Sequence, residues 1–208
     1  MQKTINSIDK LLESINSSSL ITVEKLSFGN KPTNKELIEF VLKNFNLKLS
    51  EIASTIYNNI SSLKLKWKCN LLENDFIKKY DNDDEQIYGE INIQPIEVMI
   101  HFDEKLKSEH WTGNFEKEEL KDLENFRSFD IHDEFIRMGF FIINGELSED
   151  LYFIESGNTG FSKAPFSFEE YFQMLIKYKG FLGWQYNILY KDTDDFERME
   201  HYISQIFK

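Results

Sequence analysis

The chain has 208 residues and a single cysteine, so no intrachain disulfide can form. Its formal net charge is −12, and aromatic residues make up 15% of the sequence. That length suffices for one domain with a substantial hydrophobic core. No stretch approaches the roughly 20 apolar residues that cross a bilayer, and residues 1–15 lack the continuous apolar run of a signal peptide. These features favour a soluble cytoplasmic protein.

Charge is unevenly distributed along the chain. Residues 1–80 carry 12 lysines and 8 acidic residues, a balance of +4, whereas residues 81–208 carry 12 basic and 28 acidic residues, a balance of −16. A surface of that sign repels phosphate backbones and attracts basic partners. The three arginines, Arg127, Arg137 and Arg198, are few for bidentate phosphate contacts. Nucleic-acid binding is therefore disfavoured, and solubility alone is the alternative explanation of the acidity.

The first quarter of the chain is predicted to be helical. Apolar residues recur at helical spacing over residues 5–15. Thr33 and Glu36 form a capping-box pattern before a second apolar stripe, and Ser50 stands where it can cap a third helix. Residues 1–33 are accordingly interpreted as an N-terminal helical extension.

The middle of the chain changes to a period of two residues. Apolar residues alternate with lysines over residues 63–71, which is the pattern of a half-buried strand. A second strand is predicted over residues 87–93. Two further runs, 135–143 and 151–155, have the apolar content of central strands, and Asn144-Gly145 between them predicts a turn.

The strongest local signals lie in residues 166–190. Ser167 and Glu170 form a second capping-box pattern at the start of an apolar helical stripe. Gly180 follows the last turn of that stripe, where a left-handed residue ends a helix without a Cβ clash. The aromatic segment beyond it carries too much apolar area to be left in solvent. A terminal amphipathic helix is predicted over residues 196–207.

The order of these elements predicts the fold class. Helices come first, then mostly adjacent strands, then two C-terminal helices, which is an α+β order rather than strict alternation. We expect a single domain over residues 1–208, with a central antiparallel or mixed β-sheet packed by helices.

The sequence contains few motifs that are typical of catalytic or ligand-binding sites. It has no phosphate-binding glycine loop, no HExxH motif and no Gly-x-Ser-x-Gly motif. Cys69 lies in the apolar register of its strand and is predicted to be a core residue. The run Asp130–Glu134 has cation ligands, but a solvated turn is the simpler interpretation. An enzyme would need a pocket that gathers Cys69 or His132 with a perturbed carboxyl group. We expect a non-catalytic protein without a metal or cofactor.

Asp130 has a more specific expected role in the fold. It follows Phe129, an aromatic residue that is predicted to enter the core. A carboxyl group at such a position can accept backbone N–H hydrogen bonds and fix a turn. A structural role is therefore favoured for this residue.

Short motifs that are individually weak occur in an informative order. They are Gly89–Ile93, Phe129-Asp130, Leu151–Ile154, Ser167–Tyr171 and Gly180-x-x-x-Trp184-Gln185. In this order they resemble bacterial members of the SUKH superfamily, which includes the fungal Smi/Knr cell-wall-assembly regulators. The similar portion covers residues 34–190, whereas residues 1–33 and the loop 101–118 match nothing in the family. The positions that carry the likeness are interpreted as scaffold: Trp67, Gly89, Phe129, Asp130, Tyr171, Gly180, Trp184 and Gln185.

The resemblance also implies a function. Bacterial members of the superfamily act largely as immunity proteins, which bind and neutralise a cognate protein toxin, often a nuclease. An acidic protein can fill the basic groove of such a toxin as a phosphate mimic. A regulatory or scaffold module for protein–protein interaction, as in the fungal relatives, is the alternative. The candidate toxin contacts are acidic residues in two segments: Asp81, Asp83, Asp84, Glu85, Glu116, Glu118 and Glu119.

Overall fold

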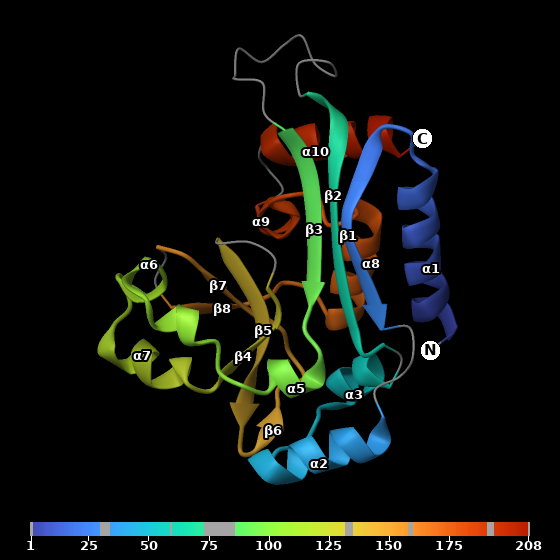
Figure 1. Ribbon diagram of the computed structural model, residues 1–208. Coiled ribbons are helices and arrows are strands. Elements are labelled where there is room, and N and C mark those ends of the chain that lie inside the picture. The colour runs from blue at the N-terminus through green and yellow to red at the C-terminus, as the bar shows by residue number, and fades with distance from the viewer. Residues whose placement is uncertain are drawn as a thin grey trace.

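The computed structural model describes residues 2–29, 34–58, 60–72, 86–131, 135–157, 160–190 and 194–207. An eight-stranded antiparallel sheet runs in the order β1-β2-β3-β4-β5-β7-β8, with β6 paired to β5 (Figure 1). The strands are β1 (Ile21–Gly29), β2 (Ser62–Leu72), β3 (Gln86–Ile93), β4 (Phe126–Asp130), β5 (Ile136–Ile143), β6 (Glu146–Leu147), β7 (Tyr152–Glu155) and β8 (Phe161–Lys163).

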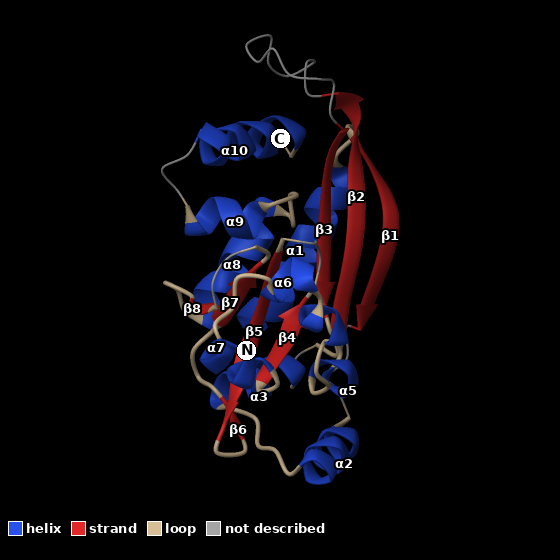
Figure 2. Cartoon of the chain, turned by 90° about the vertical axis from the view of Figure 1, so that its left-hand side faces the viewer, coloured by secondary structure: helices blue, strands red, loops and turns tan. Residues whose placement is uncertain are grey.

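Helices pack against this sheet, and the α+β fold class is confirmed. Figure 2 shows α8, α9 and α10 on one side of the strands β1 to β3. The main hydrophobic core lies between these helices and the sheet. The helices are α1 (Gln2–Ser17), α2 (Lys35–Phe45), α3 (Glu51–Tyr57), α5 (Ile96–Met99), η1 (Glu104–Lys107, a 3-10 helix), α6 (Glu109–Thr112), α7 (Lys117–Leu123), α8 (Phe168–Tyr178), α9 (Trp184–Leu189) and α10 (Asp194–Ile206).

One prediction about the N-terminal segment is wrong. The expected helical extension over residues 1–33 holds for α1, but residues 21–29 form the strand β1. That strand pairs with β2 from Ile21 opposite Cys69 to Gly29 opposite Ser62. Its backbone donors and acceptors bond to a strand more than thirty residues away in sequence, so tertiary pairing, not local propensity, determines its structure.

The predicted turn and capping signals of the later chain are confirmed. The hydroxyl of Ser167 accepts a hydrogen bond from the N–H of Glu170 at 3.2 Å, and the Glu170 carboxylate accepts one from the N–H of Ser167 at 2.7 Å. Asn144 and Gly145 have φ angles of 52° and 79° and turn β5 into β6. Both positions of this hairpin turn need positive φ, which Asn-Gly provides at little cost.

Two other details of the helices differ from the prediction. Thr33, the expected cap of α2, lies outside the described residues, and Asn34 caps this helix by accepting from the N–H of Glu36 at 2.8 Å. At the C-terminal end, a short helix, α9, lies between the two that were predicted. Residues 179–183 separate α9 from α8. Trp184, the first residue of α9, is buried in the core, whereas Tyr186 on the same helix is exposed.

The sheet is forked between β3 and β4. The two strands pair at Ile93 and Asp130 and then diverge, as Figure 2 shows. Residues 180–182, which follow α8, occupy the edge of β3 above that point, and the N–H of Glu90 donates to the carbonyl of Gly180 at 2.7 Å. Backbone groups that the divergence would leave without partners are thus satisfied. We call this region the fork.

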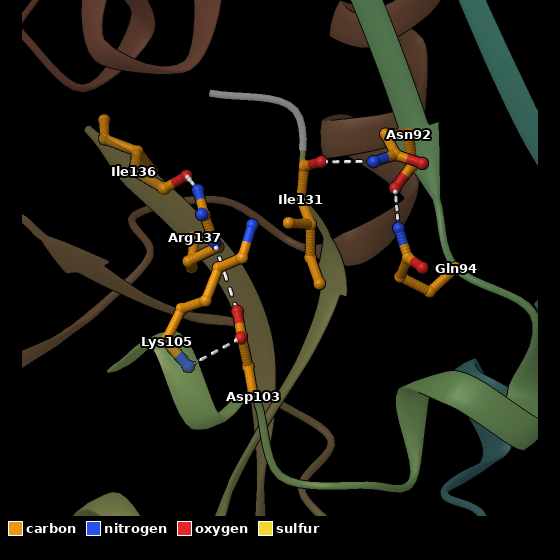
Figure 3. Close-up of polar contacts among 7 residues, drawn as sticks. All are labelled: Asn92, Gln94, Asp103, Lys105, Ile131, Ile136 and Arg137. Atoms are coloured by element: carbon orange, nitrogen blue, oxygen red, sulfur yellow. Dashed lines mark hydrogen bonds and ion pairs between the residues drawn. The ribbon is translucent and has the colours of Figure 1, made fainter. Parts of the chain in front are cut away.

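Residues 101–118, which include the helices η1 and α6, are attached to the sheet by a buried ion pair. The guanidinium of Arg137 lies 3.5 Å from the carboxylate of Asp103 (Figure 3). The same guanidinium lies over the ring of Trp111, 4.6 Å from the ring centroid. Arg137 is almost fully buried, so its charge needs these partners. Trp111 and its neighbours form a second, smaller core: Leu106, Trp111, Leu123, Phe126 and Ile154.

Amide side chains close the narrow end of the fork. Figure 3 shows Asn92 on β3 donating to the carbonyl of Ile131, the residue after β4. Gln94 donates from its side-chain amide to the carbonyl of Asn92 at 3.0 Å. The first bond continues the contact between the two strands where their regular pairing ends, and the second stays within the segment that follows β3.

Candidate partner-binding cleft

Three buried polar side chains join the fork to the helices behind it. The hydroxyl of Tyr171 on α8 donates to the carboxyl group of Asp130 at the end of β4. The side-chain amide of Gln185 on α9 lies 3.2 Å from the same carboxyl oxygen and 3.2 Å from the Tyr171 hydroxyl. Asp130 was expected to accept backbone N–H groups, whereas these donors are side chains from distant helices. The cluster links β4, α8 and α9.

The other residues of the resemblance surround the turn between α8 and α9. The indole N–H of Trp67 donates to the carbonyl of Lys179 at 2.7 Å. A Cβ atom on Gly89 would lie 2.5 Å from the Trp67 ring, so only glycine allows that ring to pack here. The ring of Trp184 lies 4.9 Å from that of Tyr171. Phe129, also predicted to be internal, is completely buried.

A cleft of about 390 Å³ opens beside the fork. Its walls come from β3, the residue before β5, the end of β7, residues 181–183, α9 and α10. The side chains that give it chemical character are aromatic or charged: Tyr88, Phe135, Glu155, Tyr186, Asp195 and Arg198. We call this the fork cleft.

Large aromatic surfaces are exposed at the fork cleft. Phe135 is 60% exposed and Tyr186 is 38% exposed. The ring of Tyr186 lies 4.6 Å from that of Tyr190, which is similarly exposed. Apolar area of this kind is expensive to leave in water, and its clustering beside a hollow is typical of a binding surface.

The carboxylates of the fork cleft are held by neighbouring groups. Glu155 accepts a hydrogen bond from the hydroxyl of Tyr190 at 2.8 Å. Asp195 lies 2.7 Å from the guanidinium of Arg198, one helical turn away on α10. Burial, together with the hydrogen bond to Glu155, raises the pKa of Tyr190 to about 12. Tyr190 therefore remains a proton donor to Glu155 at any physiological pH.

The phenol of Tyr190 should ionise near pH 12, whereas an ordinary tyrosine ionises near pH 10. The folded chain holds this proton more tightly than the unfolded chain. The contribution of Tyr190 to stability is therefore complete below about pH 10 and is lost as the pH rises toward about 12. Spectrophotometric titration of the protein and of Tyr190→Phe, by rapid mixing, gives the ionisation of this residue as the difference. A difference curve centred near pH 10 would contradict the expectation.

The predicted acidic contacts that the structure describes do not line the fork cleft. Asp81, Asp83, Asp84 and Glu85 lie outside the described residues. The other three belong to α7 and the residue before it, and Figures 1 and 2 both place α7 far from α10. Their roles also differ, and only some are suited to contact with a partner.

The three acidic residues around α7 divide into structural and exposed groups. The carboxylate of Glu119 accepts from the N–H of Glu116 at 2.7 Å, and the Glu116 side chain accepts from the N–H of Glu119, so these two residues cap the helix. The side chain of Glu118 is 81% exposed and lies 3.7 Å from Lys121. An ion pair that exposed contributes little to stability and leaves Glu118 available to a partner. Sequence alone did not separate these roles.

The aromatic and acidic lining of the fork cleft was not predicted. Glu155 and Phe135 were assigned to strands, and Tyr186 was expected in the core because of its aromatic neighbours. One feature of the sequence could have indicated the fork cleft. The C-terminal helices and the segment between them carry more aromatic residues than one helical face can bury. The fork cleft appears only once β3, β5 and the C-terminal helices are placed together.

A second hollow, of about 580 Å³, lies between α8 and α9. Its charged residues already serve the fold: Glu170 caps α8, and Lys177 lies 2.6 Å from Glu200 on α10. The fork cleft is therefore the better candidate.

No model of a known protein family matches the chain, and no curated protein is similar to it.

Cys69, the sole thiol of the chain, is buried in the core. Within the described ranges, no group of three or more histidine, cysteine, aspartate or glutamate side chains could hold a metal ion. His132 lies outside those ranges. None of the helices in the described part is both long and apolar enough for a membrane span.

Proposed function

We propose that this protein is a non-catalytic immunity protein that binds a cognate bacterial protein toxin and neutralises it. The observation that carries the proposal is the fork cleft, where exposed aromatic rings and carboxylates gather beside a buried scaffold. Aromatic anchors next to a hollow are the residues that contribute most to protein–protein binding. The likeness of the scaffold residues to the SUKH superfamily supports the same function.

The negative charge of the chain supports the proposal that the toxin is basic, as a nuclease would be. Residues 81–208 carry a balance of −16, which would accelerate the encounter with a positively charged surface. Exposed acids around α7 would contribute to this long-range attraction even if they do not touch the toxin. Buried contacts at the fork cleft would then limit dissociation.

Co-expression tests the proposal directly. Cells that produce the protein encoded beside this gene should survive only when they also produce this chain, and the two purified proteins should form a complex. Rescue by a chain that forms no complex would contradict neutralisation by binding. Failure of both would favour the alternative, a regulatory module for protein–protein interaction.

Reversing charge around α7 should slow association without changing the fold. Glu118→Lys combined with Asp122→Lys, two exposed positions on α7, should lower the association rate about tenfold at low salt, and less at physiological salt, where the screening length is about 8 Å. Glu116 and Glu119 are left intact because together they cap α7. Stopped-flow mixing with the inactivated toxin over a range of salt concentrations measures the effect.

A matched control separates local attraction from net charge. Glu13→Lys with Glu39→Lys makes the same change in charge at exposed positions on α1 and α2. The control should change the association rate far less. Equal rates for both double variants would remove α7 from the proposed interface. The same comparison with reversal of Asp81, Asp83, Asp84 and Glu85 tests the other predicted contact.

A further inference from the structure

We propose that the fork cleft receives the side chain of an arginine from a partner protein. That the partner is a protein rests on the proposed function. That its contact residue is an arginine is inferred from the side chains that line the fork cleft. Carboxylates stand on two of its walls, Glu155 at the end of β7 and Asp195 on α10. Exposed aromatic rings belong to the same lining, and carboxylates together with aromatic rings recognise a cation with a flat, apolar face.

The geometry of Glu155 suits a further donor. Its carboxylate is already oriented by the hydroxyl of Tyr190 at 2.8 Å, so less side-chain freedom would be lost on binding. A carboxylate accepts several hydrogen bonds at once, and the contact with Tyr190 is therefore compatible with another. Because the phenol of Tyr190 stays protonated, it adds no negative charge of its own at neutral pH.

The aromatic side chains favour a guanidinium over an ammonium group. A guanidinium is planar, stacks on aromatic faces and binds a carboxylate through two parallel hydrogen bonds. The exposed rings of Phe135 and Tyr186 offer such faces. Arg198 lies 2.7 Å from Asp195 in the same lining and offsets the charge of that carboxylate, so Glu155 is the carboxylate that would bind the incoming guanidinium.

The size of the fork cleft limits the ligand. Its volume of about 390 Å³ is near the lower end of the range for small-molecule sites, which begins at about 300 Å³. One long side chain with its flanking backbone fits that space better than a folded element does. An arginine at the tip of a loop is therefore the expected form.

Peptide titration tests this inference without the toxin. The isotope-labelled full chain is titrated with acetyl-Gly-Arg-Gly-amide, and with the same peptide in which citrulline, the neutral isostere, replaces arginine. The arginine peptide should shift the backbone N–H signals of Ser156 and Gly183 with a saturable dissociation constant in the range of about 1 mM. The citrulline peptide should bind at least about tenfold more weakly, because it lacks the charge.

Variants locate the site. Glu155→Gln removes the charge but keeps an acceptor for Tyr190, and Phe135→Ala removes an exposed ring; each should weaken binding of the arginine peptide about fivefold or more. Phe40→Ala is the control, since Phe40 is 64% exposed on α2, away from the fork cleft. The intact signal pattern elsewhere verifies folding of each variant.

Three results would overturn the inference. They are no saturable shift with the arginine peptide, equal binding of the two peptides, and equal weakening by Phe40→Ala and Phe135→Ala. Equal binding of both peptides with sensitivity to Phe135→Ala would instead identify an apolar site. Peptide binding without rescue from the toxin would contradict the proposed function but not the arginine site. If the Glu155→Gln variant rescued cells as well as the unchanged chain does, arginine binding would have no part in neutralisation.

Discussion

Replacing Gly180 with alanine should destabilise the protein by about 3 kcal/mol or more, whereas the same change at Gly183 should cost only about 1 kcal/mol. Both glycines have left-handed backbones, with φ of 66° and 70°. A Cβ atom at Gly180 would lie 2.4 Å from a side-chain carbon of Ile91 and 2.6 Å from the carbonyl oxygen of Glu90, but one at Gly183 meets no atom within 4 Å. The difference between the variants therefore isolates the clash inside the fork.

Urea unfolding of the two glycine variants measures this difference. The backbone oxygen of Glu90 cannot rotate away as a side chain would, so relief of the clash requires the 180–182 segment to leave the edge of β3. The N–H of Glu90 would then lose its bond to Gly180. Similar free energies of unfolding for both variants would mean that this segment moves at little cost and that the fork is not rigidly filled.

Replacing Tyr171 with phenylalanine should cost about 3 kcal/mol, although it removes a single oxygen atom. The hydroxyl donates to the carboxyl group of Asp130, and both side chains are essentially inaccessible to solvent. Without it, a buried carboxyl group loses a donor that water cannot replace. The side-chain amide of Gln185 would still donate to that carboxyl oxygen of Asp130.

Tyr178→Phe is the matched control for this change. The hydroxyl of Tyr178 lies 3.1 Å from Glu200 in a partly exposed contact, where water can take its place. Its loss should cost less than about 1 kcal/mol. Thermal and urea unfolding of both variants give the comparison, and a cost below about 1 kcal/mol for Tyr171→Phe would show that the buried cluster contributes little to stability.

Together these two experiments test whether the fork cleft has a rigid base. Gly180 and Tyr171 lie on opposite ends of α8 and its following turn, and each fixes a different wall of the fork. Pre-formed sites bind with less loss of conformational entropy than sites that must be ordered. If both costs are as large as expected, the aromatic rings at the opening project from a framework that hardly moves on binding.

Local sequence patterns determined much of the fold. The alternation of apolar residues and lysines predicted β2, Asn144-Gly145 predicted a hairpin turn, and Ser167 with Glu170 predicted the start of α8. Each feature depends on residues within a few positions of one another, so the local sequence contains the whole physical cause. The order of these elements then sufficed for the α+β class.

Other features were decided only by tertiary structure. Residues 21–29 became a strand because the edge of β2 was available, and Asp130 found its donors on α8 and α9 rather than in its own turn. The fork cleft combines residues from β3, β7, α9 and α10 with Phe135, and these parts of the chain are separated by long stretches of sequence. A local pattern reports which face of an element is apolar, but whether a ring such as Phe135 is covered depends on which distant elements pack against it.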